Sequence, residues 1–154
     1  MKYLLILVFT NIQIFCQGQI SKDSIYYGLL NQDQMELKFT LTDLDIIRRA
    51  DEILSDESKW SKSDDRICED DISSEKFSLF CALYKASVDI AGSYEHRRAA
   101  MQIVRFVIEK YGNERVLEHR LMDWNNHQDT KFSEVKQVLA TSVEIVEKEL
   151  VAKK

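Results

Sequence analysis

The chain of 154 residues contains no proline and only four glycines. These two residue types break helices most strongly, so their scarcity favours long uninterrupted helices. The length is sufficient for one domain with a sizeable hydrophobic core, but it is short for two. An apolar fraction of 45% and a charged fraction of 31% are typical of a globular protein rather than a disordered one. A single helical domain is therefore expected.

Apolar residues recur at helical spacing in five segments, the first of which begins at Thr42. Thr42 is the expected N-cap of the first segment, with Asp45 completing a capping box. The other segments cover residues 75–92, 93–112, 113–124 and 130–151. The apolar stripes include Ile46 and Ile47 in the first segment, Ile103 and Val104 in the third, and Val138 and Leu139 in the last. On the second segment the stripe is expected to contain Phe77, Phe80, Cys81, Tyr84, Val88 and Ala91.

Glycines mark two of the expected helix ends. Gly92 follows the second segment, where glycine's tolerance of left-handed backbone suits the C-cap, and Gly112 ends the third. The pattern predicts a mostly α fold, a compact bundle of about five amphipathic helices over residues 42–151.

Residues 1–18 have the pattern of a secretory signal peptide. Lys2 precedes an apolar run, 3–15, which is shorter than the roughly 20 residues that span a membrane. The small residues Cys16 and Gly18 favour cleavage after Gly18, and lipid attachment at Cys16 is the alternative. The protein is thus expected to be exported, periplasmic or extracellular, with no stable membrane insertion after cleavage.

Residues 19–41 form a polar N-terminal extension with two β-like runs, 24–30 and 35–41. In the second run every other residue from Met35 to Leu41 is apolar, which is the period of a β-strand. The pattern predicts a short hairpin, and a partly ordered extension is the alternative.

The charge of the chain excludes some partners. Its formal net charge is −5, and it has no basic stripe, so it would repel both the nucleic-acid backbone and anionic lipids. Neither a Gly-rich nucleotide-binding motif nor an HExxH zinc motif occurs, and the three histidines are scattered. We therefore expect no nucleic acid, no cofactor and no metal site.

The segment 57–74 has no helical stripe and is expected to be a long acidic loop. Trp60, Ile67 and Ile72 are expected to pin it to the core. Its carboxylates do not follow the spacing of an EF-hand, so a solvated face is favoured over a calcium site. The loop could also steer a basic partner towards the protein by electrostatic attraction. The candidate binding residues for this role are Asp64, Asp65, Asp70 and Asp71.

Cys68 and Cys81 are the two cysteines left after cleavage of the signal peptide. In an oxidising compartment they could form one disulfide. The favoured alternative is that Cys81 is a buried free thiol, because it falls on an apolar helix face.

The stretch WNNHQDT at 124–130 joins the last two helical segments. Trp124 is expected to anchor the core, one of the two asparagines to end a helix in left-handed backbone, and Asp129 or Thr130 to cap the next helix. The polar groups also suit a binding site, whose candidate residues are Trp124, Asn125, Asn126 and His127.

A Cys-His-Asn catalytic site is the enzymatic alternative for this region, with Cys81, His127 and Asn125 as candidate catalytic residues. No catalytic sequence motif surrounds Cys81, and a thiol on an apolar face is usually inert. An enzyme is therefore the less favoured reading. His96 and His119 are expected on a charged surface.

Three fragments together carry a family resemblance: RRADEILSDESKW at 48–60, FCALYKA at 80–86 and WNNHQDTKFSEVKQVL at 124–139. Their order and spacing resemble the uncharacterised bacterial family DUF6197, over about residues 42–150. The resemblance implies a small helical domain and no established activity.

From its sequence the chain is expected to be an exported helical protein that binds another protein in the bacterial envelope or outside the cell. An immunity-type inhibitor of a toxin is one concrete form. The alternative is a small-ligand-binding protein or a Cys/His-dependent enzyme.

Overall fold

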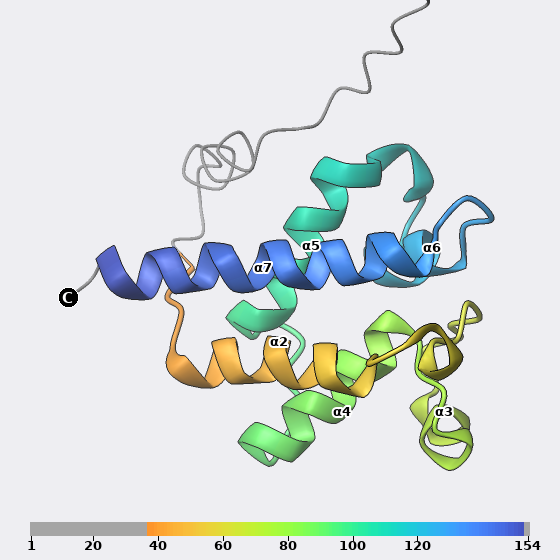
Figure 1. Cartoon of the computed structure of the whole chain (residues 1–154), viewed down its shortest axis with the longest axis horizontal. Coiled ribbons are helices and arrows are strands. Elements are labelled where there is room, and N and C mark those ends of the chain that lie inside the picture. The colour runs from red at the N-terminus through yellow and green to blue at the C-terminus, as the bar shows by residue number, and fades with distance from the viewer. Residues whose placement is uncertain (1–36, 153–154) are drawn as a thin grey trace, which may run out of the picture.

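The computed structural model describes residues 37–152, apart from the side chains of residues 70, 111 and 113 (Figure 1). This part of the chain forms six α-helices and no strand. The helices are α2 Leu41–Ile53, α3 Cys68–Ser74, α4 Leu79–Ala91, α5 Ala99–Gly112, α6 Arg120–Asn126 and α7 Phe132–Ala152. Two short 3-10 helices, Glu57–Lys59 and Asn113–Arg115, lie between them. The predicted mostly α, compact helical fold is confirmed.

The longest helix, α7, lies along the long axis of the molecule, and α2 runs beside it in the opposite direction (Figure 1). Helix α4 packs on α2, and α5 contacts both α2 and α7. The short helix α6 contacts α4 and α5, and α3 contacts α4. Within residues 37–152, no helix combines the length and the apolar character needed to cross a membrane.

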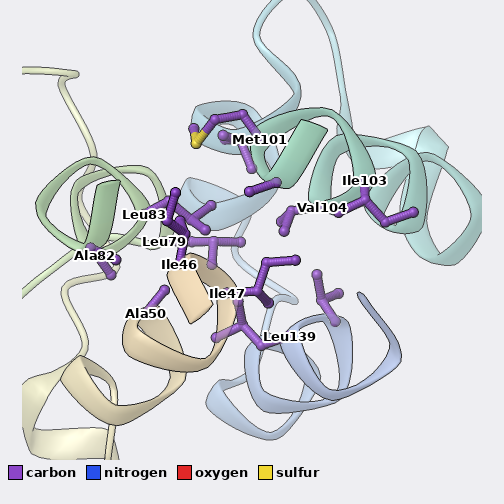
Figure 2. Packing of buried hydrophobic residues seen from close by; sticks show 14 of the residues in the cluster. Ile46, Ile47, Ala50, Leu79, Ala82, Leu83, Met101, Ile103, Val104 and Leu139 are labelled. Carbon is purple, nitrogen blue, oxygen red and sulfur yellow. The ribbon is translucent and has the colours of Figure 1, made fainter. Parts of the chain in front are cut away.

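The hydrophobic core is formed by α2, α4, α5 and α7 (Figure 2). Ile46 and Ile47 of α2 are both 0% exposed. Figure 2 shows Leu83 of α4, Val104 of α5 and Leu139 of α7 gathered around them. Complete burial of one such side chain contributes about 1.5–3 kcal/mol. The apolar stripes predicted for α2, α5 and α7 therefore do form the core.

The start of α2 differs from the prediction. Its N-cap is Thr40, two residues before Thr42, and the capping box is closed by Asp43 rather than Asp45. Asp43 is 4% exposed, and its second carboxylate oxygen accepts a hydrogen bond from the backbone N–H of Ala100, 3.1 Å away. The helix starts at the earlier cap because the carboxylate of Asp43 accepts hydrogen bonds at the starts of both α2 and α5.

On α4 the predicted core face was partly wrong. The residues that turn to the core are Leu79, Ala82, Leu83 and Ala86, all 0% exposed. Phe80 and Tyr84 lie instead on a flank, where both rings pack on Tyr94. Val88, also predicted to face inward, is 39% exposed. The core face of α4 is therefore mainly aliphatic, and its two aromatic rings pack on Tyr94 at the edge of the core.

The segment 57–74, expected to be an irregular loop, contains a 3-10 turn and helix α3. Ile67 and Ile72 were expected to pin it, but they are 56% and 46% exposed. Trp60 does hold the segment, because it packs near Phe132 with ring centroids 6.0 Å apart.

A disulfide joins Cys68 of α3 to Cys81 of α4. The favoured expectation of a buried free thiol was therefore wrong. The physical reason is that α3 contacts α4 and places the two Cα atoms 5.3 Å apart, within the roughly 4.4–6.8 Å that a disulfide spans.

The signal peptide and most of the predicted hairpin lie outside the described residues. Where the hairpin overlaps them, residues 37–40 have no regular secondary structure and Leu41 begins α2. Phe39 is nevertheless buried against the core, 9% exposed.

Candidate functional site

The asparagine pair predicted as a binding site is a structural junction. Asn125, in the last turn of α6, is 0% exposed. Its Oδ1 accepts hydrogen bonds from Nε1 of Trp60 at 2.9 Å and from the backbone N–H of Leu79 at 3.1 Å. Its Nδ2 donates to the carbonyl of Ser61 at 3.1 Å. One side chain thus joins three segments of the chain, with no polar atom left for a ligand.

The side chain of Asn126 bonds to the backbone of the same loop, at Asp64. The side-chain Oδ1 accepts from the N–H of Asp64 at 2.7 Å, and Nδ2 donates to the carbonyl of Asp64 at 2.8 Å. The prediction that an asparagine ends α6 in left-handed backbone was wrong. The C-cap is His127, whose backbone is extended at φ −60° and ψ 135°.

Trp124 is the core anchor that the sequence predicts, with 1% of its surface exposed. It packs against Gly112, where an added Cβ would come within 2.7 Å of the indole Nε1. The hydroxyl of Thr130, expected to cap α7, instead donates to the carbonyl of Trp124 at 2.6 Å. The N-terminus of α7 is closed by Glu134, whose carboxylate accepts from the N–H of Lys131 at 2.8 Å.

The residues of the predicted catalytic site are each engaged elsewhere. The sulfur of Cys81 is bonded to Cys68, and Asn125 is committed to the junction described above. His127 is half-buried, and its Nδ1 accepts a hydrogen bond from the backbone N–H of Asp129. In the oxidised chain Cys81 therefore offers no nucleophile.

The candidate acids mostly shape the loop that carries them. Asp64 is buried, 5% exposed, so a solvated face was the wrong expectation for this residue. Oδ1 of Asp64 accepts a hydrogen bond from the backbone N–H of Arg66 at 2.8 Å. In the same way, Oδ1 of Asp65 accepts from the backbone N–H of Ile67 at 2.8 Å. Asp71 accepts from the N–H of Ser78 at 2.8 Å. Burial raises the pKa of the Asp64 carboxyl.

These turns hold Arg66 in an unusual backbone conformation, with φ at +67°. Residues other than glycine rarely adopt this conformation, so the hydrogen bonds of the two aspartate turns must stabilise it. Asp70 completes the predicted acidic set, and its side chain lies outside the described part of the structure. Of the acids, Asp64 lies against the 124–129 turn, because Asn126 makes two hydrogen bonds to its backbone.

A pocket that the sequence did not indicate lies beside this loop, open to solvent and about 250 Å³ in volume. Its lining comes from the loop before α3, from α4, from the turn before α5, from α5 itself and from the start of α6. The lining residues are Arg66, Phe80, His96, Arg105, Glu118, His119, Arg120, Leu121 and Met122. Five of these nine side chains are basic and one is acidic, in a chain whose net charge is −5.

Arg105 is the most buried cation of the pocket, with 8% of its surface exposed. Its guanidinium donates to the carbonyl of His96 at 2.8 Å, and Nη2 lies 3.2 Å from Nδ1 of the same residue. Burial lowers the pKa of Arg105, although Tyr94 acts in the opposite direction, and the charges of Arg120 and Arg66 lower it further. Arginine nevertheless stays charged, so this shift measures an electrostatic cost of holding the cation here.

The imidazole of His96 takes part in the same arrangement. The charge of Arg105 lowers the pKa of His96, and burial and the charges of Arg66 and Arg97 act in the same direction. Because an arginine N–H can only donate, Nδ1 of His96 accepts, which leaves the ring neutral with its proton on Nε2. The hydroxyl of Tyr94 lies 3.2 Å from the same Nδ1.

Arg66 and Arg120 complete the basic lining. Nη1 of Arg66 lies 3.2 Å from Nε2 of His119. Arg120 is partly neutralised by Glu109 at 3.4 Å and lies over the ring of Phe106, 6.0 Å from its centroid. Among the side chains that the structure describes, no ion pair joins Arg66 or Arg105 to a carboxylate.

Asp123 positions the pocket wall that carries Glu118 and His119. Its Oδ2 accepts three backbone N–H groups, from Leu117 at 2.9 Å, Glu118 at 2.6 Å and His119 at 2.7 Å. Burial alone would raise the pKa of Asp123, but these hydrogen bonds outweigh it and lower the pKa. The carboxylate therefore stays ionised and fixes the turn that leads into α6.

The sequence offered little signal for this pocket, because its basic residues are spread over 66–120 in separate segments. His96 and His119 were assigned to a charged surface, and Arg66 stands among acids. Among the described residues, no group of three or more histidine, cysteine or acidic side chains is arranged to hold a metal ion.

The fold and the site define an all-α domain with an open basic pocket against an acidic background. The chain belongs to DUF6197, a family of unknown function, whose profile matches residues 38–144. The resemblance seen in the sequence is thereby confirmed, and the matched region contains every residue that lines the pocket. No curated protein and no solved structure matches the chain.

Proposed function

We propose that this domain binds a small anionic ligand in the pocket around Arg105. The observation that carries the proposal is a guanidinium that is 8% exposed and has neutral acceptors but no carboxylate partner among the described residues. A buried charge is normally paired, because removing it from water is costly. An anion in the pocket would supply the missing counter-charge.

The position of Arg105 also favours binding over a purely structural role. Its bond to the His96 carbonyl orients the guanidinium and organises the turn before α5. A neutral donor could make the same bond, as Gln102 does with the same carbonyl at 3.0 Å. The turn therefore does not require a positive charge, whereas anion recognition does.

The test is a thermal-shift and calorimetric comparison of anions against the full chain and Arg105→Gln. Binding at a ligand concentration one hundredfold above Kd stabilises the folded state by about 2.7 kcal/mol, which raises the melting temperature by several degrees. Sulfate, phosphate, acetate, benzoate and phenyl phosphate would be compared at constant ionic strength. Stabilisation by at least one of them, lost in Arg105→Gln, is expected.

Arg48→Gln is the matched control, because Arg48 is an exposed arginine that pairs with Glu147 on α7 and does not line the pocket. It should keep the anion response. If no anion stabilises the chain more than chloride does, the proposal is overturned.

As a second function, we propose that this is an exported protein that binds another protein in the bacterial envelope or outside the cell. An immunity-type inhibitor of a toxin is one form of this function. The favouring observation is that two exposed apolar residues adjoin the pocket lining. Leu117 is 92% exposed and precedes Glu118, while Ile67 is 56% exposed and follows Arg66. Aliphatic side chains beside a charged pocket suit a partner that inserts an acidic group.

This second function is tested by affinity purification of the tagged chain and mass spectrometry of what it retains. Retention of one stoichiometric partner should be lost in Leu117→Asp. It should persist in Val151→Asp, since Val151 is 70% exposed near the far end of α7. Equal retention by both variants would argue against this surface.

A further inference from the structure

We propose that the pocket selects a dianionic phosphomonoester whose ester group is small and apolar. This inference rests on the proposed anion-binding function and narrows it to one chemical class of ligand. It follows from the number of uncompensated cations in the pocket, their donor geometry and the apolar part of the lining.

The charge inventory favours two negative charges on the ligand. Arg105 and Arg66 have no carboxylate partner among the described residues, whereas Arg120 is shared with Glu109. The two unpaired guanidinium groups act on the same imidazole, since both lower the pKa of His96. A monoanion would neutralise one of them, and a dianion neutralises both.

The donors suit a tetrahedral oxyanion. A guanidinium has five N–H groups, so Arg105 and Arg66 keep donors beyond those that face His96 and His119, and such donors suit the oxygens of a phosphate. His96, neutral and with its proton on Nε2, is a further donor in the lining. A phosphomonoester has three terminal oxygens for these donors, while a carboxylate has two and a phosphodiester has two with a single charge.

The remaining lining is apolar. Phe80, Leu121 and Met122 form this part of the wall, and the ring of Phe80 is held edge-on by Tyr94 at a centroid distance of 5.9 Å. An inorganic phosphate would leave these side chains facing water. The volume of about 250 Å³ is below the roughly 300–1,000 Å³ of pockets for drug-sized ligands, so the part of the ester group held inside the pocket is small.

The experiment is isothermal titration of the full-length protein with matched ligands near pH 8, well above the second phosphate pKa of about 6. Phenyl phosphate is the dianion, methyl phenyl phosphate is a monoanion of similar shape, and benzoate is a monoanionic carboxylate. Phenyl phosphate should bind at least about tenfold tighter than either monoanion, and tighter than inorganic phosphate, as expected for one additional charged hydrogen-bond set.

Arg66→Gln should remove the preference for phenyl phosphate over methyl phenyl phosphate, because it leaves one unpaired guanidinium. Arg66 is exposed, and its backbone is held by the aspartate turns, so the variant is expected to fold. Arg48→Gln should keep the preference. A preference that survives in Arg66→Gln would overturn the two-arginine basis of the proposal.

The outcomes separate this inference from the function it rests on. If no anion binds, the anion-binding function fails and this inference fails with it. If benzoate or methyl phenyl phosphate binds as tightly as phenyl phosphate, anion binding stands and the dianion inference is overturned. A short phosphotyrosine peptide tests the other source of the same group, and binding tenfold tighter than that of phenyl phosphate would overturn the small-molecule assignment.

Discussion

The indole Nε1 of Trp60 donates a hydrogen bond to Oδ1 of Asn125 over 2.9 Å, across 65 positions of sequence. The same oxygen accepts the backbone N–H of Leu79, the first residue of α4. A loop, a helix start and a helix end thus depend on one fully buried amide. The pocket lies beside this junction, since Arg66 belongs to the same loop before α3 and Leu121 belongs to α6.

Replacement of Asn125 by alanine should lower the free energy of unfolding by about 2–4 kcal/mol, because buried donors from Trp60 and Leu79 lose their acceptor. Urea denaturation followed by far-UV circular dichroism measures this change. Gln128→Ala, at an exposed position in the following turn, is the control and should change stability by less than about 0.5 kcal/mol. A similar cost for both variants would contradict the bracing role of Asn125.

Gly112→Ala should destabilise the domain by about 1–3 kcal/mol, as overpacking of a buried contact does. The added Cβ would lie 2.7 Å from Nε1 of Trp124, and that indole is 1% exposed and cannot move freely. A double-mutant cycle with Trp124→Phe, read by chemical denaturation, isolates the clash. Without coupling between the two substitutions, the close approach is not the cause.

Reduction of the disulfide between Cys68 and Cys81 should cost about 3 kcal/mol, the value for a closed loop of this size. Melting curves with and without a dithiol reductant test this cost. The Cys68→Ser/Cys81→Ser variant should melt at the temperature of the reduced wild type and respond to the reductant no further. A wild-type chain that melts at the same temperature in both conditions would contradict a stabilising role.

The stability of the domain should fall as the pH drops below about 6.5, the ordinary pKa of histidine. The charge of Arg105, then burial and the charges of Arg66 and Arg97, lower the pKa of His96 in the folded state. The unfolded chain therefore takes up a proton at a higher pH than the folded chain does. Stability is lost between 6.5 and the lowered folded value, and this residue causes no further loss below it.

The His96 contribution is measured as the difference in unfolding free energy between wild type and His96→Gln from pH 7.5 to 5. Glutamine keeps an acceptor for Arg105 but does not titrate. The wild-type curve should fall more steeply, and parallel curves would exclude His96 as the source.

The sequence alone determined the class of fold and most of the core. Ile46, Ile103 and Leu139 each belong to an apolar stripe of helical spacing on its own segment, and a side chain's position on its own helix depends only on that spacing. Gly92 was correctly predicted to end α4, since its φ of +73° suits a residue without a Cβ. Trp124 was correctly predicted as a core anchor. The family resemblance also required only the order of short motifs.

Tertiary structure decided which face of α4 is buried, whether Cys68 reaches Cys81, and what the asparagines do. Each depends on which segments meet in space, and no local pattern encodes that choice. Asn125 looks like a turn residue in sequence, yet its partners lie 65 and 46 positions away. The pocket is the clearest case. Arg66, His96, Arg105 and Arg120 each look like an ordinary surface residue. Packing of α4, α5 and α6 brings them into one pocket, where the charges of Arg66 and Arg120 act on Arg105.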